Sequence, residues 1–166
     1  TGTLGGIKVS RSSSFTIGGS AAVGLGAGGF SAVNTAGSGT VTNTLSTTLH
    51  LNYLPQNEWS IGERTGLDVR APMTSIDLDG VEHIGIGGNG TVLLNASSPD
   101  LEAPITFSNA MTRILAPLAL GSSIRTVNLV AGNSRFVGAG LANDVPVRFI
   151  DSTKITADYM ADDDFG

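Results

Sequence analysis

The chain has 166 residues, a formal net charge of −5, no cysteine and 23 glycines, and only 14% of its residues are charged. The missing cysteines exclude a disulfide framework and a thiolate metal site. An acidic chain with two lysines is a poor electrostatic match for a nucleic-acid backbone. No apolar run approaches the roughly 18 residues of a membrane span, so we expect a folded domain with neither a nucleic-acid partner nor a membrane span.

The charge is distributed unevenly along the chain. Residues 1–57 contain no Asp or Glu and only two basic residues, Lys8 and Arg11. A solvated surface normally carries about a quarter of charged residues. Apolar residues recur through the same stretch, which indicates that a partner covers it. The expected assembly interface consists of Leu4, Ile7, Val9, Phe15, Ile17, Val23, Leu25 and Phe30.

The first part of the chain, residues 1–39, is rich in Gly, Ser and Ala and is predicted to be an extended arm between subunits. Short strands are expected at 4–10 and 12–18, and loop or irregular extended backbone at 20–39. The motif Gly24-x-Gly26-x-x-Gly29 matches the dinucleotide-binding fingerprint in letters. Neither the required helix nor an acidic residue about 20 positions on follows it, so no cofactor is expected.

Residues 40–160 are predicted to form a β-domain. Its clearest strand is 40–53, in which Val41, Leu45, Leu49 and Leu51 share one parity. Asp79-Gly80 is a strong hairpin signal, because type I′ turns need positive φ at both central residues. Further strands are expected at 59–70, 75–78, 81–86, 91–95, 105–107, 124–130, 135–137, 145–150 and 154–159.

One helix is expected, at 108–120. Ser108 is in place to cap it and Gly121 stands at the position that follows a helix. The expected apolar stripe is Met111, Ile114, Leu115 and Leu118. Many short strands with frequent turns favour an antiparallel β-sandwich or barrel, jelly-roll-like, with this helix, the N-terminal arm and an acidic tail at 161–166.

A cluster of carboxylates could attract a cation. Asp77, Asp79 and Glu82, with His83 beside them, are weak metal-site candidates. They lack the further oxygen ligands of a calcium loop, and an exposed hairpin tip is the favoured interpretation.

Catalysis has little support in the sequence. His50 and His83 are the two histidines, and no Gly-x-Ser-x-Gly elbow accompanies them. We therefore expect neither an enzyme nor a bound cofactor. The single tryptophan, Trp59, could contribute to an aromatic sugar platform, but its place on the apolar parity of a strand favours the core.

These patterns favour a self-assembling structural protein whose partners are copies of itself. A component of a virus or bacteriophage particle (capsid, decoration or tail protein) is the first expectation. The alternatives are a subunit of an extracellular filament or pilus, and a secreted carbohydrate-binding or adhesin module. The expected location is the virion or the cell exterior. Thr1 is compatible with removal of a leader peptide or of the initiator Met alone, and the sequence leaves both open.

Overall fold

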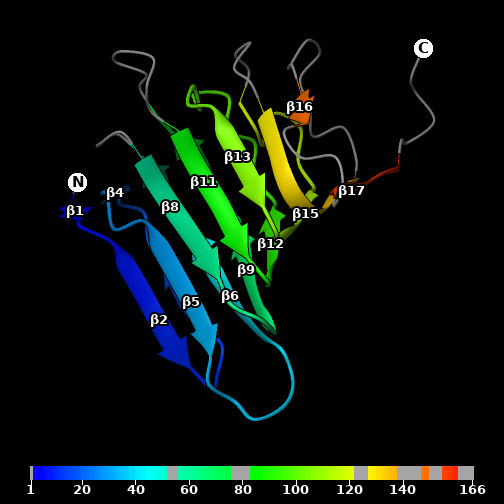
Figure 1. Ribbon diagram of the computed structural model, residues 1–166. Helices are drawn as coiled ribbons and strands as arrows, with labels where there is room; N and C mark the ends of the chain where they lie inside the picture. The colour runs from blue at the N-terminus through cyan, green and yellow to red at the C-terminus, as the bar shows by residue number, and fades with distance from the viewer. Residues whose placement is uncertain are drawn as a thin grey trace.

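In the computed structural model, every strand pair of the described residues is parallel, and the chain winds into a β-solenoid (Figure 1). The strands stack turn upon turn into three ladders, here called A, B and C. The structure describes residues 2–51, 56–75, 83–121, 127–137, 147–149 and 155–160.

Ladder A contributes one short strand to each of the first four turns. Its strands, in stacking order, are β1 (Gly2–Leu4), β4 (Val23–Leu25), β7 (Leu49–His50) and β10 (Met73–Thr74). An isolated parallel bridge between Ser75 and Leu101 extends this ladder by one more level.

Ladder B holds longer strands and runs the length of the solenoid (Figure 1). Its strands are β2 (Ile7–Arg11), β5 (Phe30–Asn34), β8 (Gln56–Ile61), β11 (His83–Gly88), β13 (Ile105–Ser108), the first part of β15 (Val127–Val137), and β16 (Val147–Phe149).

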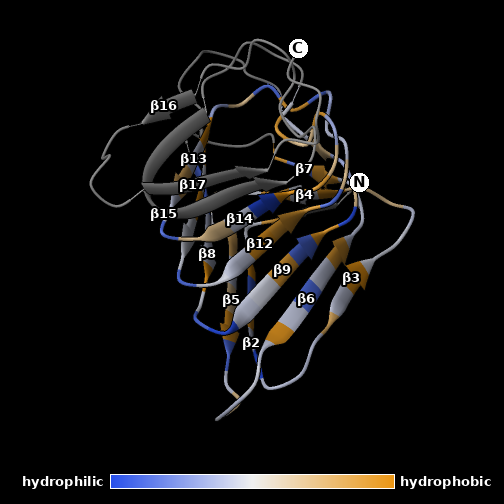
Figure 2. Ribbon diagram, turned by 90° about the vertical axis from the view of Figure 1, so that its right-hand side faces the viewer, coloured by the Kyte–Doolittle hydropathy of each residue, from blue (hydrophilic) through white to orange (hydrophobic). Residues whose placement is uncertain are grey.

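Ladder C forms the neighbouring face, which Figure 2 shows with β6, β9, β12 and β14 side by side. Its strands are β3 (Thr16–Gly18), β6 (Val41–Ser46), β9 (Thr65–Val69), β12 (Thr91–Leu94), β14 (Met111–Ile114), the second part of β15, and β17 (Ile155–Met160). Strand β15 belongs to both ladders, because it pairs with β13 and β16 in one half and with β14 and β17 in the other.

The core is a set of side-chain columns, each built from one residue per turn. In ladder B, Phe30, Trp59, Ile86 and Phe107 are in register on successive strands, and each is at most 1% exposed. The rings of Phe30 and Trp59 lie with their centroids 6.0 Å apart at 51°, a tilted aromatic contact. In ladder C the corresponding column is Leu45, Val69, Leu94 and Ile114. Burying each such side chain contributes about 1.5–3 kcal/mol.

One polar residue, Asn57, is buried among these columns and satisfies the groups around it. Its Oδ1 accepts a hydrogen bond from Trp59 Nε1 at 2.7 Å. Its Nδ2 donates to the carbonyl oxygens of Leu25 (3.0 Å) and Gly26 (3.1 Å) in the turn below. Asn57 therefore joins the second and third turns and allows the Trp59 indole to be buried without an unpaired donor.

In the second to fifth turns, the corners between ladders B and C each contain a residue with positive φ. These residues are Gly39 (φ 80°), Arg64 (56°), Gly88 (101°) and Asn109 (60°). A residue in this region turns the chain sharply, and glycine adopts it without a steric penalty. Each corner directs the chain from one ladder to the next, so the following strand pairs with a different set of neighbours.

The expected antiparallel sandwich or barrel is therefore wrong. Between β11 and β12 only Asn89 and Gly90 intervene, a spacing typical of a hairpin. Yet β11 pairs with β8 and β13, while β12 pairs with β9 and β14. Alternating burial is common to parallel and antiparallel strands, so the pattern locates strands but leaves their direction open. The Asp79-Gly80 hairpin lies outside the described residues.

The expected helix at 108–120 is also wrong, and the described residues contain no helix. Ser108 ends β13, Asn109 forms a corner, and β14 follows. Burial along β14 alternates, with Met111 39% exposed and Thr112 and Ile114 buried, which is the period of a strand. Accordingly, the described part of the chain holds no helix that could cross a membrane.

The expected extended N-terminal arm is likewise absent from the fold. Residues 2–34 form β1 to β5, which pair within the three ladders. Leu25 and Phe30 are fully buried in the chain's own core. The segment without acidic residues is thus part of the solenoid and forms the first of its described turns.

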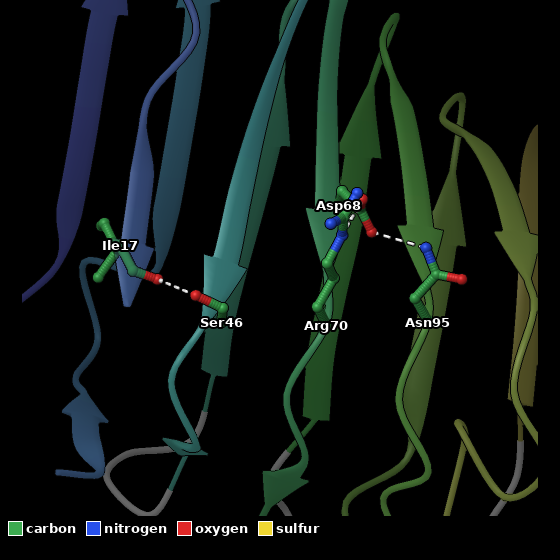
Figure 3. A network of polar contacts seen from close by, with 5 residues as sticks. All are labelled: Ile17, Ser46, Asp68, Arg70 and Asn95. Atoms are coloured by element: carbon green, nitrogen blue, oxygen red, sulfur yellow. Dashed lines mark hydrogen bonds and ion pairs between the residues drawn. The ribbon is translucent and has the colours of Figure 1, made fainter. Parts of the chain in front are cut away.

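A polar network on the outer face of ladder C ties the third turn to the fourth (Figure 3). The Asp68 side chain is only 5% exposed, and its Oδ2 accepts a hydrogen bond from Arg70 Nε at 2.6 Å. Its Oδ1 accepts from Asn95 Nδ2 at 2.7 Å. The Arg70 side chain is 62% exposed, so water screens that pair.

We expect Asn95→Ala to lower the free energy of unfolding by about 1–2 kcal/mol, because it removes a partner from a buried carboxylate. In an Asp68→Ala background the same substitution should cost much less. Urea unfolding of the two single variants and the double variant measures this coupling. Additive effects would show that the Asp68–Asn95 contact contributes nothing to stability, and Ser97→Ala, at an exposed site nearby, is the control.

Candidate assembly surface

The first turn of the solenoid has an open side. Within the described residues, β1, β2 and β3 each pair with one strand only, in the second turn. An unpaired strand edge is a template for pairing with another chain. We call the open side of β1, β2 and β3, with the apolar residues Leu4, Ile7, Val9, Phe15 and Ile17, the head edge.

The apolar columns of the core end at the head edge with incompletely covered side chains. Ile7 is half-buried, whereas its register partner Phe30 is fully buried. Ile17 is half-buried, whereas Leu45 above it is fully buried. Leu4 is 46% exposed. The residue types match those of the inner turns, and what differs is that no strand of the described chain covers them.

Backbone groups at this edge are also directed outward. The Ile7 amide donates to Gly29 O at 2.9 Å, and the Arg11 carbonyl accepts from Thr35 N at 3.0 Å. Because successive residues of a strand direct their backbone groups to opposite sides, those of Lys8 and Ser10 face the open side. In β3 the Ser46 hydroxyl donates to Ile17 O at 3.3 Å, which fixes this strand to the second turn (Figure 3). The head edge is therefore held in place and ready to pair.

The charge of the head edge is positive. Lys8 and Arg11 are exposed on β2, and the sequence holds no acidic residue before Glu58. The edge therefore carries no carboxylate that would repel an acidic partner.

The opposite end of the solenoid also ends in strands with one described neighbour. β16 and β17 each pair with β15 alone among the described residues. We call β16 and β17 the tail edge. Nothing in the sequence marks Phe149 or Tyr159 as belonging to such an edge.

The eight residues predicted for assembly fall into two groups. Leu25 and Phe30 lie in the core, out of reach of a partner. Six remain accessible to different degrees. Leu4 is exposed, and Ile7, Val9, Phe15, Ile17 and Val23 are partly buried against the core.

The candidates for metal binding and catalysis are not brought together in the described residues. Asp77, Asp79 and Glu82 lie outside them, as does the acidic tail. No group of three or more His, Asp or Glu side chains suited to a metal occurs in the part that the structure describes. His50 is half-buried on β7, and its Nδ1 lies 2.5 Å from Thr74 Oγ1, a contact between adjacent turns.

The glycine motif at 24–29 has a structural explanation. Gly28 N donates to Gly5 O at 2.7 Å and Gly26 N to Leu4 O at 2.8 Å, so two stacked corners are in backbone contact. A Cβ on Gly28 would lie 2.7 Å from Gly5 O, and one on Gly29 only 1.8 Å from Glu58 O. These glycines allow consecutive turns to approach closely, as glycine does wherever two backbones meet.

Trp59 is 1% exposed and its indole nitrogen is bonded to Asn57. It therefore cannot serve as a stacking surface for a sugar in this fold.

Comparisons with protein-family models, with curated proteins and with solved structures find no match for this chain.

Proposed function

We propose that this chain is a self-assembling structural protein, whose partners are copies of itself and whose head edge takes part in the assembly. The first setting that we propose is a virus or bacteriophage particle, as a capsid, decoration or tail component. The second is an extracellular filament, which is favoured because, among the described residues, the strands at both ends of the solenoid have one neighbour each. The protein would then be located in the virion or at the cell exterior.

The proposal rests on one observation: the apolar side chains of the first turn are incompletely buried. Stacked repeats normally end in atypical capping repeats with a polar outer face. Here Ile7, Val9 and Ile17 continue the core pattern to the edge and stay half-buried. Natural sheets usually protect such an edge with charged residues, proline or bulges, and β2 has Lys8 and Arg11 alone. An edge with this composition is suited to being covered by a further turn.

The proposal is tested by measuring self-association of the purified full chain. Multi-angle light scattering over a range of concentrations should give masses above one chain, and negative-stain electron microscopy should show rings, tubes, shells or filaments. Regular closed shells or tubes would support the particle, and open filaments the second setting. A chain that stays monomeric at every concentration would contradict the proposal.

Two lysine variants at equally exposed sites test whether the head edge is the surface through which copies associate. Leu4, at the head edge, and Val33, on the outer side of β5, are each 46% exposed. We expect Leu4→Lys to weaken association and Val33→Lys to leave it unchanged. Equal effects of the two lysines would mean that the head edge has no special part in assembly.

A further inference from the structure

Resting on the proposed self-assembly, we infer that the copies associate head to tail: the head edge of one copy pairs in parallel with the tail edge of the next. Ladders B and C then continue from copy to copy as a longer solenoid.

The register of the strands supports this arrangement. In ladder B the backbone register joins Ile7, Phe30, Trp59, Ile86, Phe107, Leu129 and Phe149. In ladder C it joins Ile17, Leu45, Val69, Leu94, Ile114, Phe136 and Tyr159. The residues at the first and last of these register positions are all of large apolar or aromatic type. If a second copy follows in the same register, Phe149 is succeeded by Ile7 and Tyr159 by Ile17, with no change in the pattern.

Like charges disfavour the pairing of two head edges. Lys8 and Arg11 are exposed on β2, and no acidic residue precedes Glu58 in the sequence. On the tail edge, β16 contains Arg148 and β17 contains Asp158, so the charges of these two strands sum to zero. A head edge therefore meets less like charge on a tail edge than on a second head edge.

The alternative is a two-fold contact between two head edges. It would place Lys8 and Arg11 of one copy against the same residues of the other. It would also pair β2 with β2 in the antiparallel sense, whereas every strand pair described in the chain is parallel. A head-to-tail contact avoids both the like charges and the antiparallel pairing. Its two surfaces lie at opposite ends of the solenoid, so it produces open-ended assemblies.

Two lysine variants, matched by column, separate these arrangements. The head variant is Ile7→Lys with Ile17→Lys, and the tail variant is Phe149→Lys with Tyr159→Lys. A charge at an edge position is a device by which natural sheets prevent pairing, and at an open edge the lysine can reach water. The control variant, Val33→Lys with Thr42→Lys, places two lysines at exposed sites of the second turn.

For head-to-tail association, the head variant alone and the tail variant alone should each be monomeric by light scattering. Their equimolar mixture should form a complex with the mass of two chains and no larger species, because each variant keeps one functional edge. The control variant should assemble like the unmodified chain.

Each other result overturns the inference in a recognisable way. A tail variant that still dimerises, with a monomeric head variant, would indicate head-to-head contact. Unchanged assembly of both variants would place the contact elsewhere, and in these two cases self-assembly itself stands. A monomeric unmodified chain would overturn both the inference and the proposed function.

Hydrogen exchange on the unmodified chain gives a test that does not depend on the folding of the variants. The amides of Lys8 and Ser10 face the open side of β2, so they should become protected as the protein is concentrated. Exchange at these two positions that is independent of concentration would overturn the inference.

Discussion

Replacing Asn57 by leucine is expected to lower the free energy of unfolding by about 2–6 kcal/mol, although leucine has nearly the same size and is more apolar. The substitution removes the hydrogen bonds that Asn57 makes to the indole N–H of Trp59 and to the carbonyl oxygen of Leu25, whereas the Gly26 carbonyl oxygen still accepts from Gly29 N at 2.9 Å. Each unpaired buried group costs about 1–3 kcal/mol. Since domains are stable by about 5–15 kcal/mol, this variant should be near the limit of folding.

Trp59 is the single tryptophan, so its fluorescence reports directly on this region during urea unfolding. Asn89→Leu, at an exposed position of the corner after β11, is the matched control and should change stability by less than about 0.5 kcal/mol. Asn57→Asp keeps an acceptor for Trp59 but loses the donor to the two carbonyls, so it too should be strongly destabilising. A small effect of Asn57→Leu would mean that the hydrogen bonds of Asn57 are not needed to join the two turns.

The sequence allowed several strands to be located, but not all of them, nor their limits and direction. The expected strand 40–53 is divided between β6 and β7, and β4 and β5 lie in the stretch 20–39 that was expected to be loop. In the stretch from Val41 to Leu51 the apolar parity correctly marks the buried positions Val41, Leu45, Leu49 and Leu51. That parity results from the pleat of a strand and is the same in parallel and antiparallel sheets. The decision between them depends on whether a corner such as Gly88-Asn89-Gly90 reverses the chain or directs it into the next ladder. Only the pairing of whole turns determines this.

The repeat itself was hidden by unequal turns. From Ile7 to Phe30 a turn takes 23 residues, from Phe30 to Trp59 it takes 29, and from Ile86 to Phe107 it takes 21. Repeats are recognised by a fixed period, which loops of varying length remove. The columns also contain Phe, Trp, Ile and Leu at equivalent positions. Successive turns therefore have a similar shape without having similar sequences.

The head edge could be predicted from the sequence only in part, because its residues resemble those of the inner turns. The scarcity of charge in residues 1–57 predicted that a partner covers this stretch. That stays a prediction, because cover can come from two sources, the next turn of the same chain and a partner. Leu25 and Phe30 are covered by the next turn of the same chain, while Ile7 and Ile17 are only half covered. Composition cannot distinguish the two sources, because the inner and outer turns of a solenoid are built from the same kinds of residue.

The close stacking of the corners leads to a second large expected effect, that of Gly29→Ala. Gly29 has φ 55°, and a Cβ there would lie 1.8 Å from the carbonyl oxygen of Glu58 in the next turn. The left-handed conformation alone costs a residue with a Cβ about 1–2 kcal/mol. The obstacle is backbone and cannot rotate away, so the third turn has to move, at a further cost of about 1–3 kcal/mol. We expect a total loss of about 2–5 kcal/mol.

Substitutions at two other glycines separate the conformational cost from the cost of the backbone clash. Gly39 has φ 80° and nothing within 4 Å of its added Cβ, so Gly39→Ala should show the conformational cost alone. Gly37 has open space around it and no positive φ, so Gly37→Ala should be neutral or stabilising by up to about 1 kcal/mol. Urea unfolding of the three variants should rank their losses as Gly29, then Gly39, then Gly37. If Gly29→Ala cost no more than Gly39→Ala, the second and third turns would not be in contact at this corner. The stacking that brings Phe30 into register with Trp59 would then lack its closest backbone contact.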